Sequence, residues 1–347
     1  MTRMTTTMCD FRPLNLSALA QALRDNTDSL VIFHRHPDGD AIGSGFALRL
    51  LLEEMGCNVL CACEDEIPER FRFLVGDRQE SILRERLPAD FAPVQIITVD
   101  TASPAQMGTL YPVYEGKITL MIDHHAKGTV YADGWVDGSA SSAGEMVFLL
   151  SRELLKTGRI SRIPDGVDKL LYAAVSSDTG CFRYSNVTTA THVCAAELLA
   201  EGTFDPAELN HLLFEVKSEK LLLAERLGAE RLVCRLDGAL GIVTFPASLK
   251  QKYALTDEHL ETLVDIPRSL EGVQVAVAIR QPSDAPVFRV SMRSNTDIDV
   301  SAVCAQFGGG GHIKAAGCTI ELPTVTTVEE AAEAVEAAVK KAFRGNL

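Results

Sequence analysis

Residues 31–54 read VIFHRHPDGDAIGSGFALRLLLEE, and this stretch passes from one kind of secondary structure to another. The apolar run LVIF at 30–33 is typical of a buried strand. The pattern at 43–55 is that of a helix, which we expect to end at Gly56. A strand that leads into a helix is the repeating unit of an α/β fold.

Between the two elements stands the polar segment HRHPDGD. Pro37 and Gly39 favour a tight turn there. Asp40, taken alone, would serve as a helix cap. The alternative is that three side chains of the segment converge on a positively charged ligand: His34, Asp38 and Asp40.

Three more apolar runs are expected to be strands, NVLCAC at 58–63, QIITVD at 95–100 and ITLMID at 118–123. Helical stretches lie between or after them, at 70–75 and 144–157. Strands that alternate with helices predict an α/β fold with a doubly wound, mostly parallel sheet. In such sheets ligands bind at the carboxyl ends of the strands.

The pattern changes in the last third of the chain. Residues 205–230 look helical, and the segments after them (LVCRLDGALGIVTFP, VQVAVAIRQ, FRVSMRS) alternate as antiparallel strands do. We therefore expect a first domain over residues 1–215. A smaller α/β domain with a mixed or antiparallel sheet is expected over residues 230–347.

Length and composition narrow the class of protein. The 347 residues exceed one comfortable core, which also favours two domains. A net charge of −14 argues against a broad basic surface for long nucleic acid. No apolar run approaches the ~20 residues of a membrane span, and the first 15 residues lack the apolar core of a secretory signal. A cytoplasmic location is expected.

Nine cysteines are scattered along the chain. The only cluster, CNVLCAC at 57–63, matches no zinc-binding spacing. It coincides with an expected buried strand, where cysteine acts as a small apolar residue. The odd count and the missing signal argue against a disulfide framework.

Acidic and imidazole side chains follow the predicted strands instead of being scattered. A helix at 167–176 delivers a further aspartate. Each has a simpler explanation alone, since Asp100 could cap the next helix and Asp178 could lie in a turn. Six such coincidences favour a shared site made of His34, Asp38, Asp40, Asp100, His124 and Asp178.

Carboxylates brought together in this way repel one another and raise one another's pKa values. Two divalent cations, about 3.5–4 Å apart and sharing a carboxylate, would remove the conflict. Oxygen and imidazole ligands suit manganese, and iron, cobalt or zinc less selectively.

The glycines of the opening stretch raise a rival interpretation. Gly39, Gly43 and Gly45 have the spacing of a short-chain dehydrogenase. Such enzymes need a Tyr-x-x-x-Lys pair, and none of the six tyrosines is followed four residues later by lysine. The dehydrogenase interpretation is therefore set aside.

Five motifs carry a resemblance to the DHH phosphoesterase superfamily. They occur in the family's order and cover essentially the whole chain. Within the superfamily, the length resembles the branch of bifunctional oligoribonucleases and 3'-phosphoadenosine 5'-phosphate phosphatases. The longer RecJ-type exonucleases carry additional domains. The motifs are HRHPDGD at 34–40, VD at 99–100, DHH at 123–125, SSDTG at 176–180 and FGGGGHIKAAG at 307–317.

The resemblance implies a role for each residue. One metal ion would be held by His34 and Asp38. The other would be held by Asp40, His124 and Asp178. Asp100 would bridge both ions and take part in catalysis, and His125 would face the scissile phosphate. His36 has no counterpart and is expected to be a turn residue.

The glycine run of the second domain is not a P-loop, because no Lys-Ser or Lys-Thr follows it. Glycines let backbone amides approach an anion, and we expect a helix N-terminus after them to favour the anion further. The resemblance implies a nucleotide clamp formed by Gly309, Gly310, Gly311 and His312. Arg293 is expected to contact a phosphate or base. Arg183 and Asn186 are candidates for lining the cleft.

The predicted function is that of a manganese-dependent phosphoesterase with two divalent ions, Mg²⁺ or Co²⁺ being alternatives to Mn²⁺. The resemblance implies that it degrades short single-stranded RNA and dinucleotides to nucleoside monophosphates in the manner of a 3'–5' exoribonuclease. The 3'-phosphate of 3'-phosphoadenosine 5'-phosphate is a further expected target. Membranes and long duplexes are not expected partners, and a homodimer is left open.

Other phosphoesterase activities remain alternatives. A cyclic-dinucleotide phosphodiesterase is one. A polyphosphatase or pyrophosphatase is a less favoured alternative, and the GGGGH motif argues against the pyrophosphatase. A nucleotide sensor without activity is disfavoured because no ligand position is degenerate. Substrate preference, cleavage polarity, native metal and oligomeric state are left undecided by the sequence.

Overall fold

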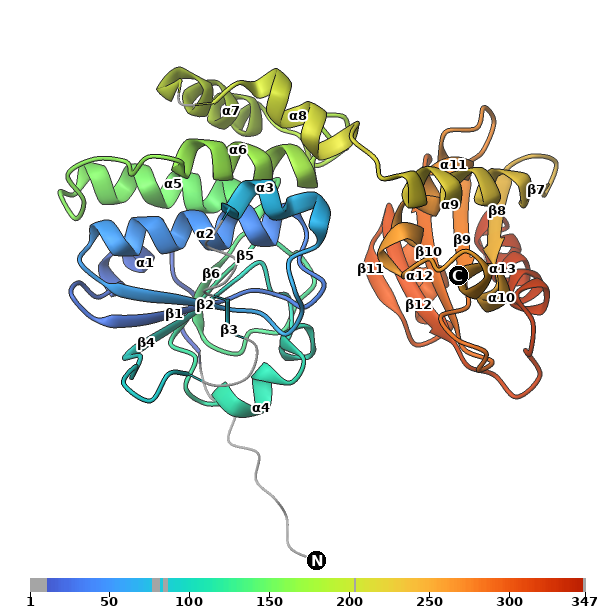
Figure 1. Ribbon diagram of the computed structural model, residues 1–347, viewed down its shortest axis with the longest axis horizontal. Coiled ribbons are helices and arrows are strands. Elements are labelled where there is room, and N and C mark those ends of the chain that lie inside the picture. The colour runs from blue at the N-terminus through green and yellow to red at the C-terminus, as the bar shows by residue number, and fades with distance from the viewer. Residues whose placement is uncertain (1–10, 77–81, 84–86, 203, 346–347) are drawn as a thin grey trace, which may run out of the picture. The chain divides into compact units, whose positions relative to one another are not determined.

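The computed structural model describes residues 11–76, 82–83, 87–202 and 204–345 (Figure 1). The chain divides into two compact units, Met1–Val216 and Lys217–Leu347. The segment 205–230, expected to be helical, contains two helices, α8 (Pro206–Phe214) and α9 (Glu219–Glu230). The division falls between these helices, so α9 belongs to the second unit. No helix in the described ranges has the length and apolar character needed to cross a membrane.

The first unit is built on a six-stranded sheet. Its strands are β1 (Asp28–Ile32), β2 (Asn58–Ala62), β3 (Ile82–Leu83), β4 (Gln95–Val99), β5 (Leu120–Asp123) and β6 (Asp133–Val136). The order is β3-β2-β1-β4-β5-β6, and neighbouring strands are parallel throughout. The predicted α/β class with a mostly parallel sheet is confirmed. The sequence pattern did not reveal β3 or β6.

Helices cover both faces of this sheet (Figure 1). Residues of β1 alternate between two cores, since Val31 packs with Leu51 on one face and Ile32 with Leu110 on the other. Burial on both faces explains why this strand reads as an unbroken apolar run. The helices are α1 (Leu16–Ala22), α2 (Gly39–Glu54), α3 (Arg72–Val75), α4 (Leu110–Tyr114), α5 (Ala143–Lys156), α6 (Val167–Asp178) and α7 (Thr189–Glu201), with 3-10 turns η1 (Glu69–Phe71) and η3 (Pro104–Met107).

Glycines allow α2, α5 and α6 to approach closely. A Cβ atom at Gly43 would lie 2.4 Å from the carbonyl oxygen of Leu170 in α6. One at Gly144 in α5 would lie 2.4 Å from the Cβ atom of Ala174, also in α6. The glycine spacing that resembled a dehydrogenase is therefore explained in part by helix packing.

The second unit contains a mixed sheet, as predicted. Its strands are β7 (Leu232–Arg235), β8 (Leu240–Phe245), β9 (Val275–Arg280), β10 (Phe288–Ser294), β11 (Gly310–His312) and β12 (Ala315–Ile320), in the order β11-β12-β10-β9-β8-β7. Among the described strands of this second sheet, only β8 and β9 pair in parallel. The other elements are α10 (Ala247–Lys252), η4 (Glu258–Val264), α11 (Asp265–Arg268), α12 (Val300–Ala305) and α13 (Val328–Phe343).

One face of β10 is buried and the other is open. Val290 and Met292 pack with Val303 of α12 and Val335 of α13. The residues between them point the other way and are partly or fully exposed, as are the matching residues of β12. This unit therefore presents a stretch of open sheet.

All eight cysteines in the described ranges are free thiols. Cys61 and Cys63 are completely buried, as expected for small apolar residues in and beside β2. Cys9 lies outside the described residues.

Candidate active site

The strand order of the first sheet reverses direction between β1 and β4. The chain runs outward from β1 through β2 to β3 and then returns to β4 on the other side, which is the point where α/β sheets bind ligands. His34 follows β1 and Asp100 directly follows β4. Asp123 ends β5 and precedes His124 and His125. The carboxyl ends of these neighbouring strands bring the predicted residues together.

Asp100 lies at the centre of the group. Its Oδ2 atom is 3.4 Å from Nε2 of His34, and its Oδ1 atom is 3.5 Å from Nε2 of His124. The residue is 2% exposed. Its backbone has a φ of +52°, a conformation that aspartate tolerates better than most residues. Asp100 thus faces both histidines at once.

Two further sets of contacts extend from this centre. On one side, Nε2 of His34 is 3.7 Å from Oδ1 of Asp38. On the other, Nε2 of His124 is 3.7 Å from Oδ2 of Asp40 and 3.8 Å from Oδ2 of Asp178. Within each set, His34–Asp38–Asp100 and Asp40–His124–Asp178, one potential ligand atom per residue lies within 4.8 Å of the others.

The hydrogen bonds of His34 determine which ring nitrogen can bind a cation. Its Nδ1 atom lies 2.8 Å from the carbonyl oxygen of Arg35, which can only accept. Nδ1 must therefore carry the proton and donate. The lone pair of the neutral ring is left on Nε2, the atom that faces Asp38 and Asp100.

The carboxylates of the site repel one another. Burial raises the pKa of Asp178, and the charges of Asp38 and Asp100 raise it further, to about 7. Burial and then the charge of Asp100 raise the pKa of Asp40 well above its usual value. In the absence of cations, protons must neutralise part of the site at neutral pH.

The surrounding carboxylates favour the charged form of the two central histidines. Burial alone would lower the pKa values of His34 and His124, but attraction to Asp100 and to the other carboxylates outweighs burial and raises both. Burial would raise the pKa of Asp100, but the two imidazoles hold it well below its usual range. Positive charge at the centre of the site is therefore stabilised by the carboxylates around it.

The residues present fit divalent cations. Oδ1 of Asp100 is buried and has no hydrogen-bond partner among the described residues. Leaving such an atom unpaired costs about 1–3 kcal/mol, and a cation would remove that cost. The ligand atoms are oxygen and imidazole nitrogen without thiolate, a set that suits hard or borderline divalent ions. Two cations would also relieve the repulsion between the carboxylates.

The helix cap differs from the expectation for Asp40. The N-cap of α2 is Asp38, whose Oδ1 accepts from the amides of Asp40 and Ala41, both at 3.0 Å. Asp38 takes this position because its backbone is extended, as an N-cap requires. Asp40 already lies in the first turn, and its carboxylate accepts from the amides of Ala143 and Gly144 instead.

His36 lies in the turn, as expected. Its φ is +53°, and Asp65 accepts from both its backbone amide at 2.8 Å and its Nδ1 at 2.9 Å. The ring is thereby drawn to the loop after β2.

Two residues of the site were missed or undervalued by the sequence analysis. Asp123 was treated as a motif residue only, yet its Oδ1 lies 2.8 Å from Nδ1 of His125. Asn186 was a candidate for lining the cleft, and its Nδ2 donates to Asp178. Arg183 is exposed, and its Nε donates to the carbonyl oxygen of Gly180. The strict spacing of DHH was a signal for Asp123, whereas no pattern marks Asn186.

The second half of the glycine run leads into a strand, which corrects the expected helix N-terminus. Gly310, Gly311 and His312 form β11, and a turn leads to β12. Glycine's freedom serves the close pairing of two strands here, since a Cβ atom at Gly309 would lie 2.2 Å from the carbonyl oxygen of Gly317. Helix α12 precedes the glycines, where the expectation had placed a helix after them.

Arg293 and His312 lie on the same side of this sheet. Both pair with Ala315 of β12, one from each neighbouring strand. Residues directly opposite in an antiparallel pair point to the same face. Arg293, Ala315 and His312 therefore form a row across the open face.

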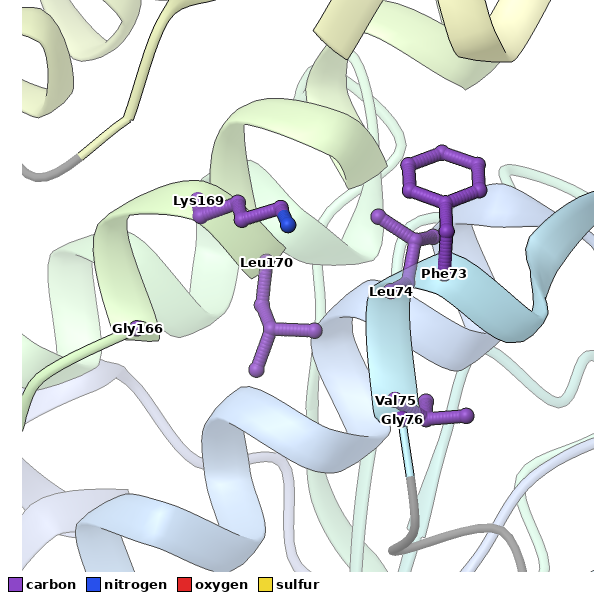
Figure 2. Close-up of a pocket in the computed structure, with 7 residues that line it drawn as sticks. All are labelled: Phe73, Leu74, Val75, Gly76, Gly166, Lys169 and Leu170. Atoms are coloured by element: carbon purple, nitrogen blue, oxygen red, sulfur yellow. The ribbon is translucent and has the colours of Figure 1, made fainter.

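A cavity of about 480 Å³ elsewhere in the first unit is not the site of this chemistry. Figure 2 shows Lys169 and Leu170 of α6 opposite Phe73 and Leu74 of α3. Among the described residues, those that line it include no aspartate and no histidine, so they do not provide the predicted ligands.

Comparison with known proteins gives two family matches and several relatives. Residues 29–175 match the DHH family N-terminal domain, and residues 243–342 match the DHHA1 domain. A protein of Streptococcus mutans named a probable bifunctional oligoribonuclease and PAP phosphatase is 30% identical, over 83% of this chain and 88% of that protein. A bifunctional oligoribonuclease and PAP phosphatase of Bacillus subtilis is 29% identical, over 84% and 89%.

A solved structure shares the fold. The exopolyphosphatase-related protein of Bacteroides fragilis superposes with a TM-score of 0.81 at 22% identity, covering 94% of this chain and 95% of that one. The strand-end aspartates and histidines, the two family matches and the identity to relatives of similar length agree, and the chain belongs to the DHH family of phosphoesterases.

Proposed function

We propose that this protein hydrolyses short oligoribonucleotides and dinucleotides to nucleoside monophosphates, and that it removes the 3'-phosphate of 3'-phosphoadenosine 5'-phosphate (PAP). The position of Asp100 gives the strongest support, because its two carboxylate oxygens lie 3.4 and 3.5 Å from Nε2 of His34 and of His124. The activities in the names of the relatives support this class of substrate. The cytoplasmic location expected from the sequence belongs to the same proposal.

In this proposal the ligands divide between two ions. His34 and Asp38 hold one, and the set Asp40, His124 and Asp178 holds the other. Asp100 would be the ligand shared by both. Mn²⁺ is the proposed ion, with Mg²⁺ or Co²⁺ as alternatives. Bound by these residues, such ions would supply a more acidic water and positive charge for the phosphoryl oxygens.

His125 stabilises charge on the phosphate. Burial alone would lower the pKa of this imidazole, but the hydrogen bond to Asp123 and the charge of Asp100 outweigh burial and raise it. Because Nδ1 points at the Asp123 carboxylate, a raised pKa favours the form in which Nε2 also carries a proton. That proton can be donated to a phosphoryl oxygen as negative charge builds up there.

The open face of the second unit binds the nucleotide part of the substrate. Arg293 supplies a planar, permanently charged fork for a phosphate or base, and His312 lies in the same row. Gly310 offers backbone to a ligand, since a Cβ atom there would meet nothing within 4 Å. Gly309 and Gly311 keep β11 close to β12.

A rate comparison in Mn²⁺ tests the proposal. The substrates are linear dinucleotides, a five-nucleotide RNA, a long single strand, a cyclic dinucleotide, PAP and pyrophosphate. We expect the linear dinucleotide and the five-nucleotide RNA to be hydrolysed fastest, with measurable release of phosphate from PAP. Faster turnover of the long strand would contradict a preference for short substrates. A preference for the cyclic dinucleotide or for pyrophosphate would replace the proposal with one of the alternatives.

A further inference from the structure

Asn186 connects a candidate metal ligand to a distant loop. Its Nδ2 donates to the carbonyl oxygen of Ser141 at 2.8 Å, to the carbonyl oxygen of Asp178 at 3.2 Å and to Oδ2 of Asp178 at 3.3 Å. The Asp178 carboxylate at the end of α6 is therefore held from outside its own helix. Because Ser141 directly precedes the N-cap of α5, the bond ties the ends of two helices together.

The orientation of the Asn186 amide follows from its surroundings. All three neighbours of Nδ2 are oxygens that accept, so turning the amide over would direct Oδ1 at three acceptors. In the present orientation Oδ1 is buried without a partner among the described residues. An unpaired buried acceptor costs about 1–3 kcal/mol. The bonds made by Nδ2 outweigh that cost.

Ser141 is fixed in turn by a buried acid. Glu145 is 4% exposed and lies in the first turn of α5. Its Oε2 atom accepts from the hydroxyl of Ser141, from the amide of Ser141 at 3.2 Å and from the hydroxyl of Thr191 at 3.0 Å. Glu145 reaches Asp178 only through this chain of hydrogen bonds.

The same turn also holds Asp40. The amide of Ala143 donates to Oδ2 of Asp40 at 2.7 Å, and that of Gly144 donates to Oδ1 at 2.8 Å. Amides at a helix N-terminus stabilise a negative charge beside them. Residues 141–144 thus position both carboxylates of the Asp40–His124–Asp178 set.

The other set is positioned by different groups. Asp38 accepts from the amides of Asp40 and Ala41 in its own helix. His34 donates to the carbonyl oxygen of Arg35. Neither contact involves α5 or Asn186. A change at the start of α5 would therefore act directly on one set, and would reach the other set only through Asp100 and the amide of Asp40.

We propose that Asn186 and Glu145 are positioning residues for one metal ion only, the ion bound by Asp40, His124 and Asp178. The inference rests on the two-metal function proposed above. In this role the two residues set the affinity for that ion, and with it the metal concentration at which the enzyme becomes active.

Calorimetric titration of the metal-free protein with Mn²⁺ tests this inference. We expect two binding events in the unmodified protein. In Asn186→Ala one event should weaken by about 10- to 100-fold, the usual effect of losing a group that supports a ligand, while the other is unchanged. Glu145→Gln, which removes the charge and keeps the shape, should weaken the same event by a smaller factor.

Asn295→Ala is the matched control. Nδ2 of Asn295 also bridges two carbonyl oxygens, those of Arg268 and Val273, both at 2.9 Å, but in the second unit. Both binding events should keep their affinities in this variant. The Mn²⁺ concentration for half-maximal hydrolysis should rise in Asn186→Ala and stay constant in Asn295→Ala.

The outcomes separate this inference from the proposed function. If the unmodified protein binds fewer than two Mn²⁺ ions, the two-metal function fails, and the inference with it. If it binds two and both affinities are unchanged, or equally weakened, in Asn186→Ala, only the positioning role fails. Should circular dichroism show that Asn186→Ala is unfolded, the Glu145→Gln titration decides by the same criteria.

Discussion

Nδ1 of His125 donates a hydrogen bond to Oδ1 of Asp123 over 2.8 Å, so the first and last residues of the DHH motif are joined directly. The bond fixes the ring orientation and stabilises its protonated form. The middle residue of the motif faces the carboxylates instead. In the proposed mechanism, the motif therefore supplies both a metal ligand, His124, and the residue that stabilises charge on the phosphate, His125.

Asp123→Asn should lower kcat by roughly a hundredfold, within the usual range for loss of a positioned proton donor. The amide can still accept the hydrogen bond but no longer stabilises a charged imidazole. His125→Gln should have at least the same effect. Steady-state kinetics with a dinucleotide will measure both, and Mn²⁺ affinity should be unchanged. If His125→Gln retains full kcat, His125 takes no part in the chemistry.

Asp100→Asn should lower hydrolysis by at least about a thousandfold, equivalent to ~4 kcal/mol of transition-state stabilisation. Asparagine tolerates the positive φ of this position, so the fold should persist. Circular dichroism will establish the fold and a dinucleotide assay the activity. Full activity in this variant would contradict the two-metal proposal. Asp100→Ala should also be inactive, with a small additional loss of stability.

Stability of the metal-free protein should fall as the pH rises from about 4 to 7. The raised pKa values of Asp178, about 7, and Asp40 mean that the folded state binds more protons in this window than the unfolded chain, whose aspartates titrate near 3.9. The raised pKa values of His34 and His124 act in the same direction. Their stabilisation is complete below about pH 6.5 and is lost above it.

Urea unfolding after chelation, at pH 5.5 and 7.5, will measure this slope. Asp178→Asn should make the slope shallower, because one titrating group is removed. Added Mn²⁺ should bind more tightly as the pH rises, since the cation replaces the protons. A metal-free protein that is more stable at pH 7.5 than at 5.5 would refute the assignment.

Arg293→Ala should raise KM for a dinucleotide about tenfold or more while kcat changes little, because the side chain binds substrate without touching the reacting bond. Arg293→Lys should restore only part of the affinity, since lysine lacks the planar fork. Arg235→Ala is the control. It removes an arginine from the edge strand of the same unit, where Nε lies 3.5 Å from Glu336. Equal KM changes in both variants would indicate a general charge effect.

Gly311→Ala should destabilise the second unit by about 2 kcal/mol or more, because φ is +139° and the new Cβ atom would lie 2.6 Å from the carbonyl oxygen of Ala315. Gly310→Ala should leave the melting temperature unchanged, since the added atom meets nothing within 4 Å. Thermal unfolding of both variants will test the pair. If both melt alike, the packing of β11 on β12 is not what requires the glycine at 311.

The parts of the fold that depend on local pattern could be predicted from the sequence. Apolar runs identified β1, β2, β4 and β5, and polar residues after them predicted where Asp100 and His124 would meet. This succeeded because the carboxyl ends of parallel strands share one edge of the sheet. Strand β3, with two residues, and β6, in which only two residues are buried, carry too little pattern to be recognised.

Contacts between distant segments could not be predicted in this way. The bond from Gly144 to Asp40 spans 104 residues, and that from Asn186 to Ser141 spans 45. Neither residue type nor spacing marks such pairs. The glycine run failed for another reason, because glycine's freedom is compatible with both a helix N-terminus and a strand hairpin.

The close approach of Gly43 to the backbone of Leu170 makes the candidate active site sensitive to the spacing of two helices. Asp40 stands near the start of α2 and Asp178 at the end of α6, so a side chain inserted between the helices would push the two carboxylates apart. An enlarging substitution at position 43 should therefore impair metal affinity before it unfolds the protein. In this fold a packing residue within a helix acts as a spacer that sets the width of the proposed metal site.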